Sequence, residues 1–139
     1  RAVEGQIEGS VLLGFGFSCF EECRYDQNGK HLNPNFRDYR FPTALDMPRI
    51  KTIVCSDYDK EGPMGAKEAG EGSTAPVGSA IGNAINYATG LVMHELPITP
   101  ERLWAALRDH EKTGKKEFGA EDLPEKFDSM PPLPRRYDV

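Results

Sequence analysis

The sequence of 139 residues lacks the apolar material that a self-contained core of this length requires. Hydrophobic residues make up 38% of the chain and there is a single tryptophan. An excess of positive charge is also missing, because 17 lysines and arginines stand against 22 aspartates and glutamates, for a net charge of −5. A general nucleic-acid binder would carry a clustered basic surface. We therefore expect one domain at most, which depends on a partner polypeptide and binds no nucleic acid.

Long hydrophobic runs are absent too. The longest uncharged stretch, Gly72 to Met93, is interrupted by glycines and by the polar residues Ser73, Thr74, Asn83 and Asn86. That polarity argues against a membrane span and against a membrane partner. The sequence has neither an initiator methionine nor a basic-then-apolar leader, and we expect residue 1 to be a processed, trimmed or internal start.

Cysteine is scarce, and the three examples are Cys19, Cys23 and Cys55. An odd number of thiols without a secretory leader favours reduced cysteines and a cytoplasmic location. Two thiols four residues apart, with no second pair and no nearby histidine, make a poor zinc site. We expect ordinary buried thiols and no metal ligands among them.

What is present begins with a glycine-containing apolar segment. Residues 5–20 read GQIEGSVLLGFGFSCF and leave almost no polar face, which is typical of a buried helix. Gly5, Gly9 and Gly16 weaken such a helix and make sense only where another backbone or a ligand approaches closely. Gln6 is a polar exception at its start, where unpaired N–H groups favour an anionic ligand.

The middle of the chain is predicted to be mostly irregular. Asn28-Gly29 is typical of the type I′ turn of a β-hairpin. Residues 33–48 contain three prolines and little periodicity, which favours an extended, ordered loop. Residues 50–56 (IKTIVCS) are rich in β-branched side chains and predict a strand. Residues 57–75 are broken by glycines and a proline and predict a long loop, which is usually functional or disordered.

The clearest helix covers residues 76–89, where apolar residues follow the i, i+3, i+4 rule. Ser73 or Thr74 can cap its start, and Gly90 is expected to end it.

The remaining elements are a short strand at 92–96 and a further helix. That helix opens at Thr99 with a capping hydroxyl followed by proline and glutamate, and it ends at Gly114. From residue 111 on, acids alternate with bases and prolines crowd the end of the chain. This tail either lies along a partner surface or is a frayed terminus.

The strongest chemical signal is the glycine-rich run GPMGAKEAGEG at residues 62–72, which leads directly to a predicted helix start. Small residues let a bulky ligand touch the backbone, and free N–H groups favour its anionic parts. The run is not a Walker loop, because no Gly-Lys-Ser/Thr follows at the required spacing, nor is it a dinucleotide fingerprint. From the residues alone, Glu71 is either a catalytic carboxylate or a solvated loop side chain.

Four segments in order resemble a single family: GQIEGSVLLGFGFSCFEE, NGKHLNPNFRDYRFPTALDMPRI, GPMGAKEAGEG and PVGSAIGNAINYATGLVMHELPITPERLWAAL. Over residues 4–108 the chain resembles the C-terminal part of the molybdenum-cofactor-binding subunit of the xanthine oxidase/aldehyde oxidase family, the molybdenum hydroxylases. The resemblance implies an α+β fold in which residues 1–110 are part of a molybdopterin-binding domain and 111–139 form an irregular tail. The implied elements are a buried glycine-rich helix, a hairpin, a strand and two further helices.

The site residues carry over from the resemblance position by position. The family's catalytic glutamate ends a stretch of the form Lys-x-x-Gly-Glu, which Glu71 matches. In the family the backbone before that glutamate contacts the cofactor, as does the glutamine that opens a Gln-x-x-Gly helix. The implied cofactor-binding residues are therefore Gln6, Lys67, Glu68, Ala69 and Gly70.

The resemblance implies a molybdopterin-dependent oxidoreductase that is active only with partner chains. In that family a metal-bound hydroxide, deprotonated by the glutamate as general base, hydroxylates or oxidises an aromatic, N-heterocyclic or aldehyde-type small molecule. The implied cofactor is molybdenum-molybdopterin, in its cytosine dinucleotide form. A larger molybdopterin-binding chain is the implied partner, with 2Fe-2S clusters and FAD on further chains. The sequence itself has no cysteine run of the kind that binds such clusters.

Two positions depart from the family pattern. Leu13 precedes Gly14 where the family commonly has a second glutamine, and Gly72-Ser73 follows Glu71 where purine- and aldehyde-oxidising members often have prolines. The second departure favours the branch that acts on aromatic acids, their CoA thioesters or N-heterocycles. The alternative interpretation is a non-catalytic assembly or cofactor-insertion subunit of such a complex.

Overall fold

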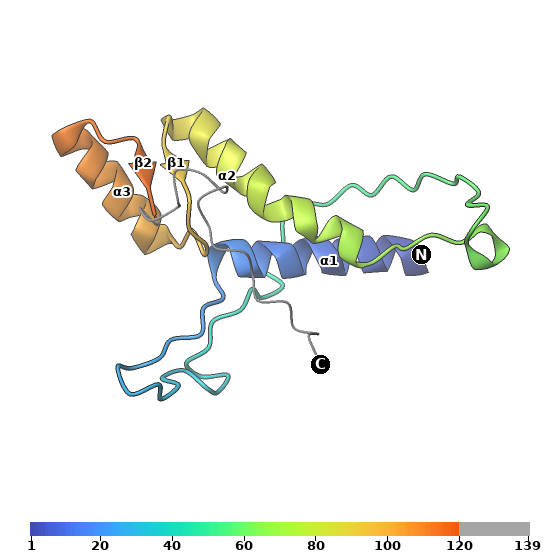
Figure 1. Cartoon of the computed structure of the whole chain (residues 1–139), viewed down its shortest axis with the longest axis horizontal. Helices are drawn as coiled ribbons and strands as arrows, with labels where there is room; N and C mark the ends of the chain where they lie inside the picture. Colours follow the sequence, from blue (N-terminus) through green and yellow to red (C-terminus); the bar gives the residue numbers. More distant parts are fainter. Residues whose placement is uncertain (120–139) are drawn as a thin grey trace, which may run out of the picture.

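The computed structural model describes residues 1–119, in which two long helices pack against each other beside a third helix and a very small sheet (Figure 1). This is the mixed helix and strand architecture that the sequence predicts, with helix predominating. In chain order the elements are α1 (Ala2–Cys19), the short 3₁₀ helices η1 (Pro63–Gly65) and η2 (Glu71–Ser73), α2 (Ala75–Thr89), β1 (Val92–Met93), α3 (Pro100–Thr113) and β2 (Glu117–Phe118).

The contact between α1 and the start of α2 is made at Gly14. A Cβ atom at this position would lie 2.8 Å from the carbonyl oxygen of Thr74 and 2.8 Å from the side chain of Val77. The Thr74 hydroxyl also donates a hydrogen bond of 3.2 Å to the carbonyl oxygen of Ser10. The two helices therefore meet backbone to backbone, at a distance that only glycine permits.

The predicted close approach to the other glycines of α1 is confirmed at one of them. A Cβ atom at Gly16 would collide with the side chain of Glu21 and lie 3.0 Å from Pro42 Cδ. At Gly5 and Gly9 it would meet no atom of residues 1–119 within 4 Å. Within the described chain, these two glycines are not explained by packing.

Helix α1 is buried on one side and not all round, so the expectation of a wholly buried helix is wrong for residues 1–119. Its side chains Leu13 and Phe17 are 48% and 47% exposed. The described elements that pack on it are α2 and η2, and they leave the opposite side open. The fully buried positions are small residues: Ser10, Gly14, Gly16 and Ser18.

The core of residues 1–119 is small and lies beyond the C-terminal end of α1. Its buried hydrophobic residues are Leu91, Ile98 and Ala106. The N–H of Ile98 donates a hydrogen bond of 2.6 Å to the carbonyl oxygen of Ser18, which ties this core to the last turn of α1. So little buried apolar area contributes little to the stability of the fold.

The third helix begins and ends as its sequence predicts. The Thr99 hydroxyl accepts a hydrogen bond of 3.2 Å from the N–H of Arg102, and Gly114 ends α3 in the left-handed conformation. β1 then pairs in parallel with β2, with Val92 opposite Glu117. The predicted strand at 92–96 is confirmed in shortened form, and α3 and β2 carry the described fold past residue 110. Residues 120–139 of the predicted tail lie outside the described residues.

The start of α2 differs from its predicted capping. Thr74 is the N-cap residue, but its hydroxyl makes no capping hydrogen bond because it is committed to the Ser10 carbonyl. At the other end, Gly90 closes the helix in the left-handed conformation, as predicted. The long loop at 57–75 contains both 3₁₀ helices, whereas 33–48 holds no helix or strand, as expected of an ordered loop.

The turn at Asn28-Gly29 is not of type I′. Gly29 has a positive φ of 79°, but Asn28 does not, and the N–H of Gly29 donates to the Asp26 carbonyl. This is a type I turn followed by a left-handed glycine, and the Asp26 carboxylate stabilises it by accepting the Asn28 N–H at 2.8 Å. The predicted hairpin is reduced to one antiparallel bridge between Tyr25 and His31.

The strand predicted at residues 50–56 does not form. No backbone hydrogen bond joins this stretch to the rest of residues 1–119, and Ile53 and Val54 are 75% and 49% exposed. β-branched residues form a strand only when a second strand supplies donors and acceptors. The described chain does not provide that second strand.

The three cysteines are free thiols, as predicted, but they are not all buried. Cys19 lies partly buried at the end of α1, where burial raises the pKa of its thiol. Cys23 and Cys55 are exposed, because the segments that carry them have few neighbours in the described chain. None of the helices within residues 1–119 combines the length and the apolar character that crossing a bilayer requires.

The contact at Gly14 gives the first prediction. Replacing Gly14 by alanine forces α2 away from α1 and should lower the free energy of unfolding by about 1–3 kcal/mol. Gly82→Ala is the matched control, since a Cβ there meets nothing within 4 Å and should raise stability by up to about 1 kcal/mol. Urea denaturation of the purified protein that carries this chain measures both, and equal effects would contradict the proposed packing.

Candidate functional site

The predicted site residues come together where the glycine-rich loop meets the first half of α1. The loop enters η2 and α2, and the start of α2 crosses α1 (Figure 1). Gln6 points from α1 to this loop, because its Oε1 lies 3.9 Å from the position that a Cβ of Gly70 would occupy. Two predicted cofactor-binding residues that are distant in sequence are therefore neighbours in space.

Glu68 is a third member of this cluster. Its Oε2 accepts a hydrogen bond of 3.0 Å from the N–H of Gly72, and its Oε1 lies 3.4 Å from the Cβ position of Gly70. The carboxylate thus lies over the turn that contains Glu71.

Glu71 is the first residue of η2 and is exposed, and its side chain makes no hydrogen bond or ion pair with residues 1–119. The turn around it is held by backbone hydrogen bonds, from Ser73 to the Gly70 carbonyl at 3.3 Å and from Thr74 to the Glu71 carbonyl at 2.9 Å. The carboxylate of Glu71 is therefore placed by its backbone alone and is free to meet a ligand.

Lys67 and Ala69 complete the predicted set. Lys67 is exposed and Ala69 is half-buried. Among the described residues, no acceptor pairs with the backbone N–H groups of residues 67–71. Five successive unpaired donors beside small residues form a surface that suits an oxygen-rich, anionic ligand.

The threonine at the start of α2 fixes this loop on α1. Thr74 and Ser10 are 64 residues apart in sequence, and their hydrogen bond ties the end of η2 to the helix that carries Gln6. Pro76 follows in the first turn of α2, where its lack of an N–H has no cost. The placement of Gln6 beside Gly70 is thus a consequence of the α1–α2 contact.

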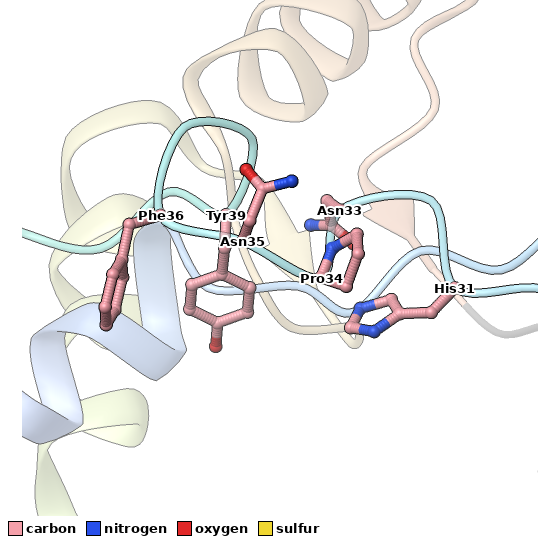
Figure 2. A pocket seen from close by; sticks show the side chains of 6 residues that line it. All are labelled: His31, Asn33, Pro34, Asn35, Phe36 and Tyr39. Atoms are coloured by element: carbon pink, nitrogen blue, oxygen red, sulfur yellow. The ribbon is translucent and has the colours of Figure 1, made fainter.

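A separate pocket lies in the loop after α1 (Figure 2). Its lining includes His31, whose Nε2 is buried without a hydrogen-bond partner among residues 1–119, and Tyr39. The Tyr39 hydroxyl donates a hydrogen bond of 2.8 Å to Glu21, which with burial raises the pKa of Tyr39 to about 12. The segment that lines this pocket, residues 31–39, lies beyond the C-terminal end of α1, whereas the glycine-rich loop lies toward its N-terminal end (Figure 1). Phe36, which also lines the pocket, is 84% exposed.

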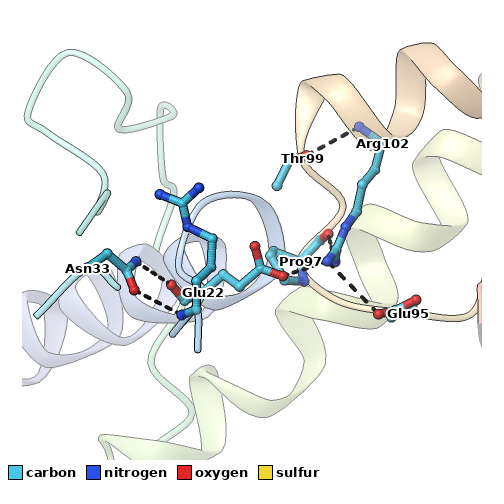
Figure 3. A network of polar contacts seen from close by, with 7 residues as sticks. Glu22, Asn33, Glu95, Pro97, Thr99 and Arg102 are labelled. Carbon is cyan, nitrogen blue, oxygen red and sulfur yellow. Dashed lines mark hydrogen bonds and ion pairs between the residues drawn. The ribbon is translucent and has the colours of Figure 1, made fainter. Parts of the chain in front are cut away.

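A polar network joins the end of α1 to the start of α3 (Figure 3). Arg102 pairs with Glu22 at 2.5 Å and donates to the Pro97 carbonyl at 2.9 Å. Asn33 joins the network by donating to the Glu22 carbonyl at 2.7 Å and accepting from the Arg24 N–H at 2.9 Å. The ion pair of Arg102 with Glu22 and the two hydrogen bonds of Asn33 hold the segment after α1 against the start of α3.

Within residues 1–119 no cluster of three or more histidine, cysteine, aspartate or glutamate side chains could hold a metal ion.

Comparison with known proteins points to one family. Residues 1–48 match the family described as the molybdopterin cofactor-binding domain. A putative xanthine dehydrogenase molybdenum-binding subunit of Escherichia coli strain K12 is 38% identical over 102 residues, which is 73% of this chain and 14% of that protein. Subunit gamma of the 6-hydroxypseudooxynicotine dehydrogenase complex of Paenarthrobacter nicotinovorans is 36% identical over 73% of this chain and 13% of its own length.

Solved structures give the same picture. Quinoline 2-oxidoreductase from Pseudomonas putida 86 superposes with a TM-score of 0.70 and 32% identity, over 77% of this chain and 14% of that one. The Cu,Mo-CO dehydrogenase superposes with a TM-score of 0.66 and 31% identity, over 81% of this chain. The chain thus spans about one seventh of the length of the proteins it matches.

The hydrogen bond from Thr74 to Ser10 gives the second prediction. Thr74→Val removes the donor from a partly buried carbonyl and should lower the free energy of unfolding by about 1 kcal/mol. Thr74→Ser keeps the hydroxyl and should retain most of that stability. The comparison uses denaturant unfolding of the protein that carries this chain, and indistinguishable variants would show that the hydrogen bond does not hold α2 on α1.

Proposed function

The chain belongs to the molybdenum-binding subunits of the xanthine oxidase/aldehyde oxidase family, and from this we propose that it provides the general base of a molybdenum-dependent oxidoreductase. Glu71 is the proposed base. Gln6 and the backbone of Lys67, Glu68, Ala69 and Gly70 are the proposed contacts to the molybdopterin cofactor. The observation that carries the proposal is the meeting of Gln6 with Gly70, because it places the two predicted cofactor-binding segments side by side.

The residues of this cluster fit such a cofactor. A molybdopterin is large, flat, rich in oxygen and anionic, so it needs close backbone approach and hydrogen-bond donors. Gly70 and Ala69 permit close approach, and the unpaired N–H groups of 67–71 supply donors that cost nothing to redirect. The Gln6 side chain, at the edge of the same surface, adds an amide that can both donate and accept.

The bound cofactor supplies the redox and oxygen-transfer chemistry. The part of Glu71 is to accept a proton as oxygen is transferred to the carbon of the substrate. The carboxylate of Glu71 is suited to accepting a proton because it makes no hydrogen bond or ion pair with residues 1–119. Gly70 and Gly72, on either side of Glu71, have no side chains and so leave room for the cofactor and the substrate to reach its carboxylate.

The residues after Glu71 bear on the substrate class. We propose an aromatic acid, its CoA thioester or an N-heterocycle, because Gly72-Ser73 stands where purine- and aldehyde-oxidising members often have prolines. Gly72 N–H is turned back to Glu68, a geometry that a proline at this position could not make because it has no N–H.

The remaining proposals concern the cofactor form and the partners. We propose the cytosine dinucleotide form of the cofactor, a larger molybdopterin-binding polypeptide as the main partner, and 2Fe-2S clusters and FAD on further chains. The exposed apolar residues support a partner: Leu13 and Phe17 on α1, and Ile53 in the unpaired stretch, are all about half exposed or more. The small core of residues 1–119 also needs additional buried surface.

The role of Glu71 gives the third prediction. Glu71→Gln in the assembled enzyme should leave the molybdenum content near normal and cut turnover by about 10²–10⁴-fold, because an amide cannot accept the proton. Glu61→Gln is the matched control on the same loop, since its side chain has no partner among residues 1–119, and it should be fully active. Full activity of Glu71→Gln would remove the residue from the mechanism and favour the non-catalytic interpretation.

The unpaired stretch at 50–56 gives the fourth prediction. In the assembled protein a strand of the larger polypeptide should pair with it, and its amide hydrogens should exchange at least about 100-fold more slowly than in an unfolded peptide. The amides of residues 57, 58 and 60, which make no hydrogen bond among residues 1–119, serve as the internal control and should exchange fast. Hydrogen–deuterium exchange with mass spectrometry reads both, and equally fast exchange in the two stretches would exclude the pairing.

A further inference from the structure

We propose that Glu68 is a positioning residue for Glu71, a role that rests on the proposed function of Glu71 as general base. The carboxylate of Glu68 folds back over the turn and holds the backbone on the far side of Glu71. The resemblance implies only backbone contact between this part of the loop and the cofactor. The positioning role belongs to the Glu68 side chain and is separate from that contact.

The first observation is the hydrogen bond that spans Glu71. Glu68 Oε2 accepts the N–H of Gly72 at 3.0 Å, so residues on either side of the proposed base are joined by one side chain. A carboxylate acceptor makes a stronger bond than a neutral one.

The second observation is that Gly72 makes room for this carboxylate, whereas a Cβ atom at Gly70 would be in ordinary van der Waals contact with it. A Cβ atom at Gly72 would lie 2.8 Å from Glu68 Oε2, and one at Gly70 would lie 3.4 Å from Glu68 Oε1. Gly72 has no positive φ that would require glycine, so the space for Glu68 is a sufficient reason for glycine at this position.

The third observation is that little else fixes the turn. One of its backbone hydrogen bonds, from Ser73 to the Gly70 carbonyl, is long at 3.3 Å, and the side chain of Glu71 has no partner among residues 1–119. A change in the turn therefore moves the Glu71 carboxylate directly. A general base that is displaced by a fraction of an ångström loses catalytic efficiency even though substrate still binds.

The test is kinetic and uses the assembled enzyme. Glu68→Ala should lower kcat by about tenfold, the equivalent of one charged hydrogen bond, with KM and molybdenum content unchanged. Glu68→Gln keeps an oxygen that can accept the Gly72 N–H and should restore kcat to within about threefold of the original enzyme. Glu61→Ala, which removes an unpartnered carboxylate from the same loop, is the matched control and should have no effect.

A second variant reaches the same hydrogen bond from its other end. Gly72→Ala places a Cβ against Glu68 Oε2, the mobile end of a flexible side chain, and should displace it without unfolding the turn. The kcat loss should match that of Glu68→Ala, and the double variant Glu68→Ala/Gly72→Ala should lose no more than either single one.

Three kinetic results would overturn the proposal. One is normal kcat in Glu68→Ala, a second is a Glu68→Gln enzyme as impaired as Glu68→Ala, and a third is fully additive losses in the double variant. A loss of molybdenum in Glu68→Ala would assign the side chain to cofactor binding instead and would also overturn it. Glu71→Gln distinguishes failure of the proposed function from failure of the positioning role. If Glu71→Gln is fully active, the proposed function fails. If Glu71→Gln is inactive and Glu68→Ala has a normal kcat, only the positioning role fails.

Discussion

The backbone contact between α1 and the start of α2 is the constraint on which the rest of the structure depends. Gly14 lets the Thr74 carbonyl and Val77 approach α1 to a distance that any side chain would prevent, and the Thr74 hydroxyl closes the contact on Ser10. Because η2 immediately precedes α2, this one crossing also determines where the glycine-rich loop lies. The proximity of Gln6 to Gly70 follows from this helix crossing.

The second general feature is that the chain exposes apolar side chains that its own core does not cover. The interior around Leu91, Ile98 and Ala106 is small, while the outer side of α1 and the stretch around Ile53 remain open. Polar interactions compensate in part, since Arg102 joins the segment after α1 to the start of α3 through Glu22 and the Pro97 carbonyl. Residues 1–119 therefore hold the glycine-rich loop by a few close contacts while leaving apolar surface uncovered.

Local signals predicted those elements whose causes lie within a few residues. The cap at Thr99, the left-handed glycines at 90 and 114 and the periodicity of α2 all act over one or two helical turns. The predictions were wrong where the structure of a segment depends on residues that are distant in sequence. Residues 50–56 have the composition of a strand but no described strand to pair with, and α1 has the composition of a buried helix but is covered on one side. At Asn28 the turn is of type I in place of the predicted type I′, and the Asp26 carboxylate stabilises it by accepting the Asn28 N–H.

The sequence by itself determined the α2 and α3 helices, the glycines that end them and the glycine-rich loop, and through the family resemblance it proposed Glu71 and its neighbours as site residues. Only the tertiary structure decided that Gln6 lies against Gly70 and that the Glu68 carboxylate closes over Gly72. The physical reason is that helix signals are local, whereas the meeting of residues 6 and 70 depends on how two helices pack, which no short window of sequence contains.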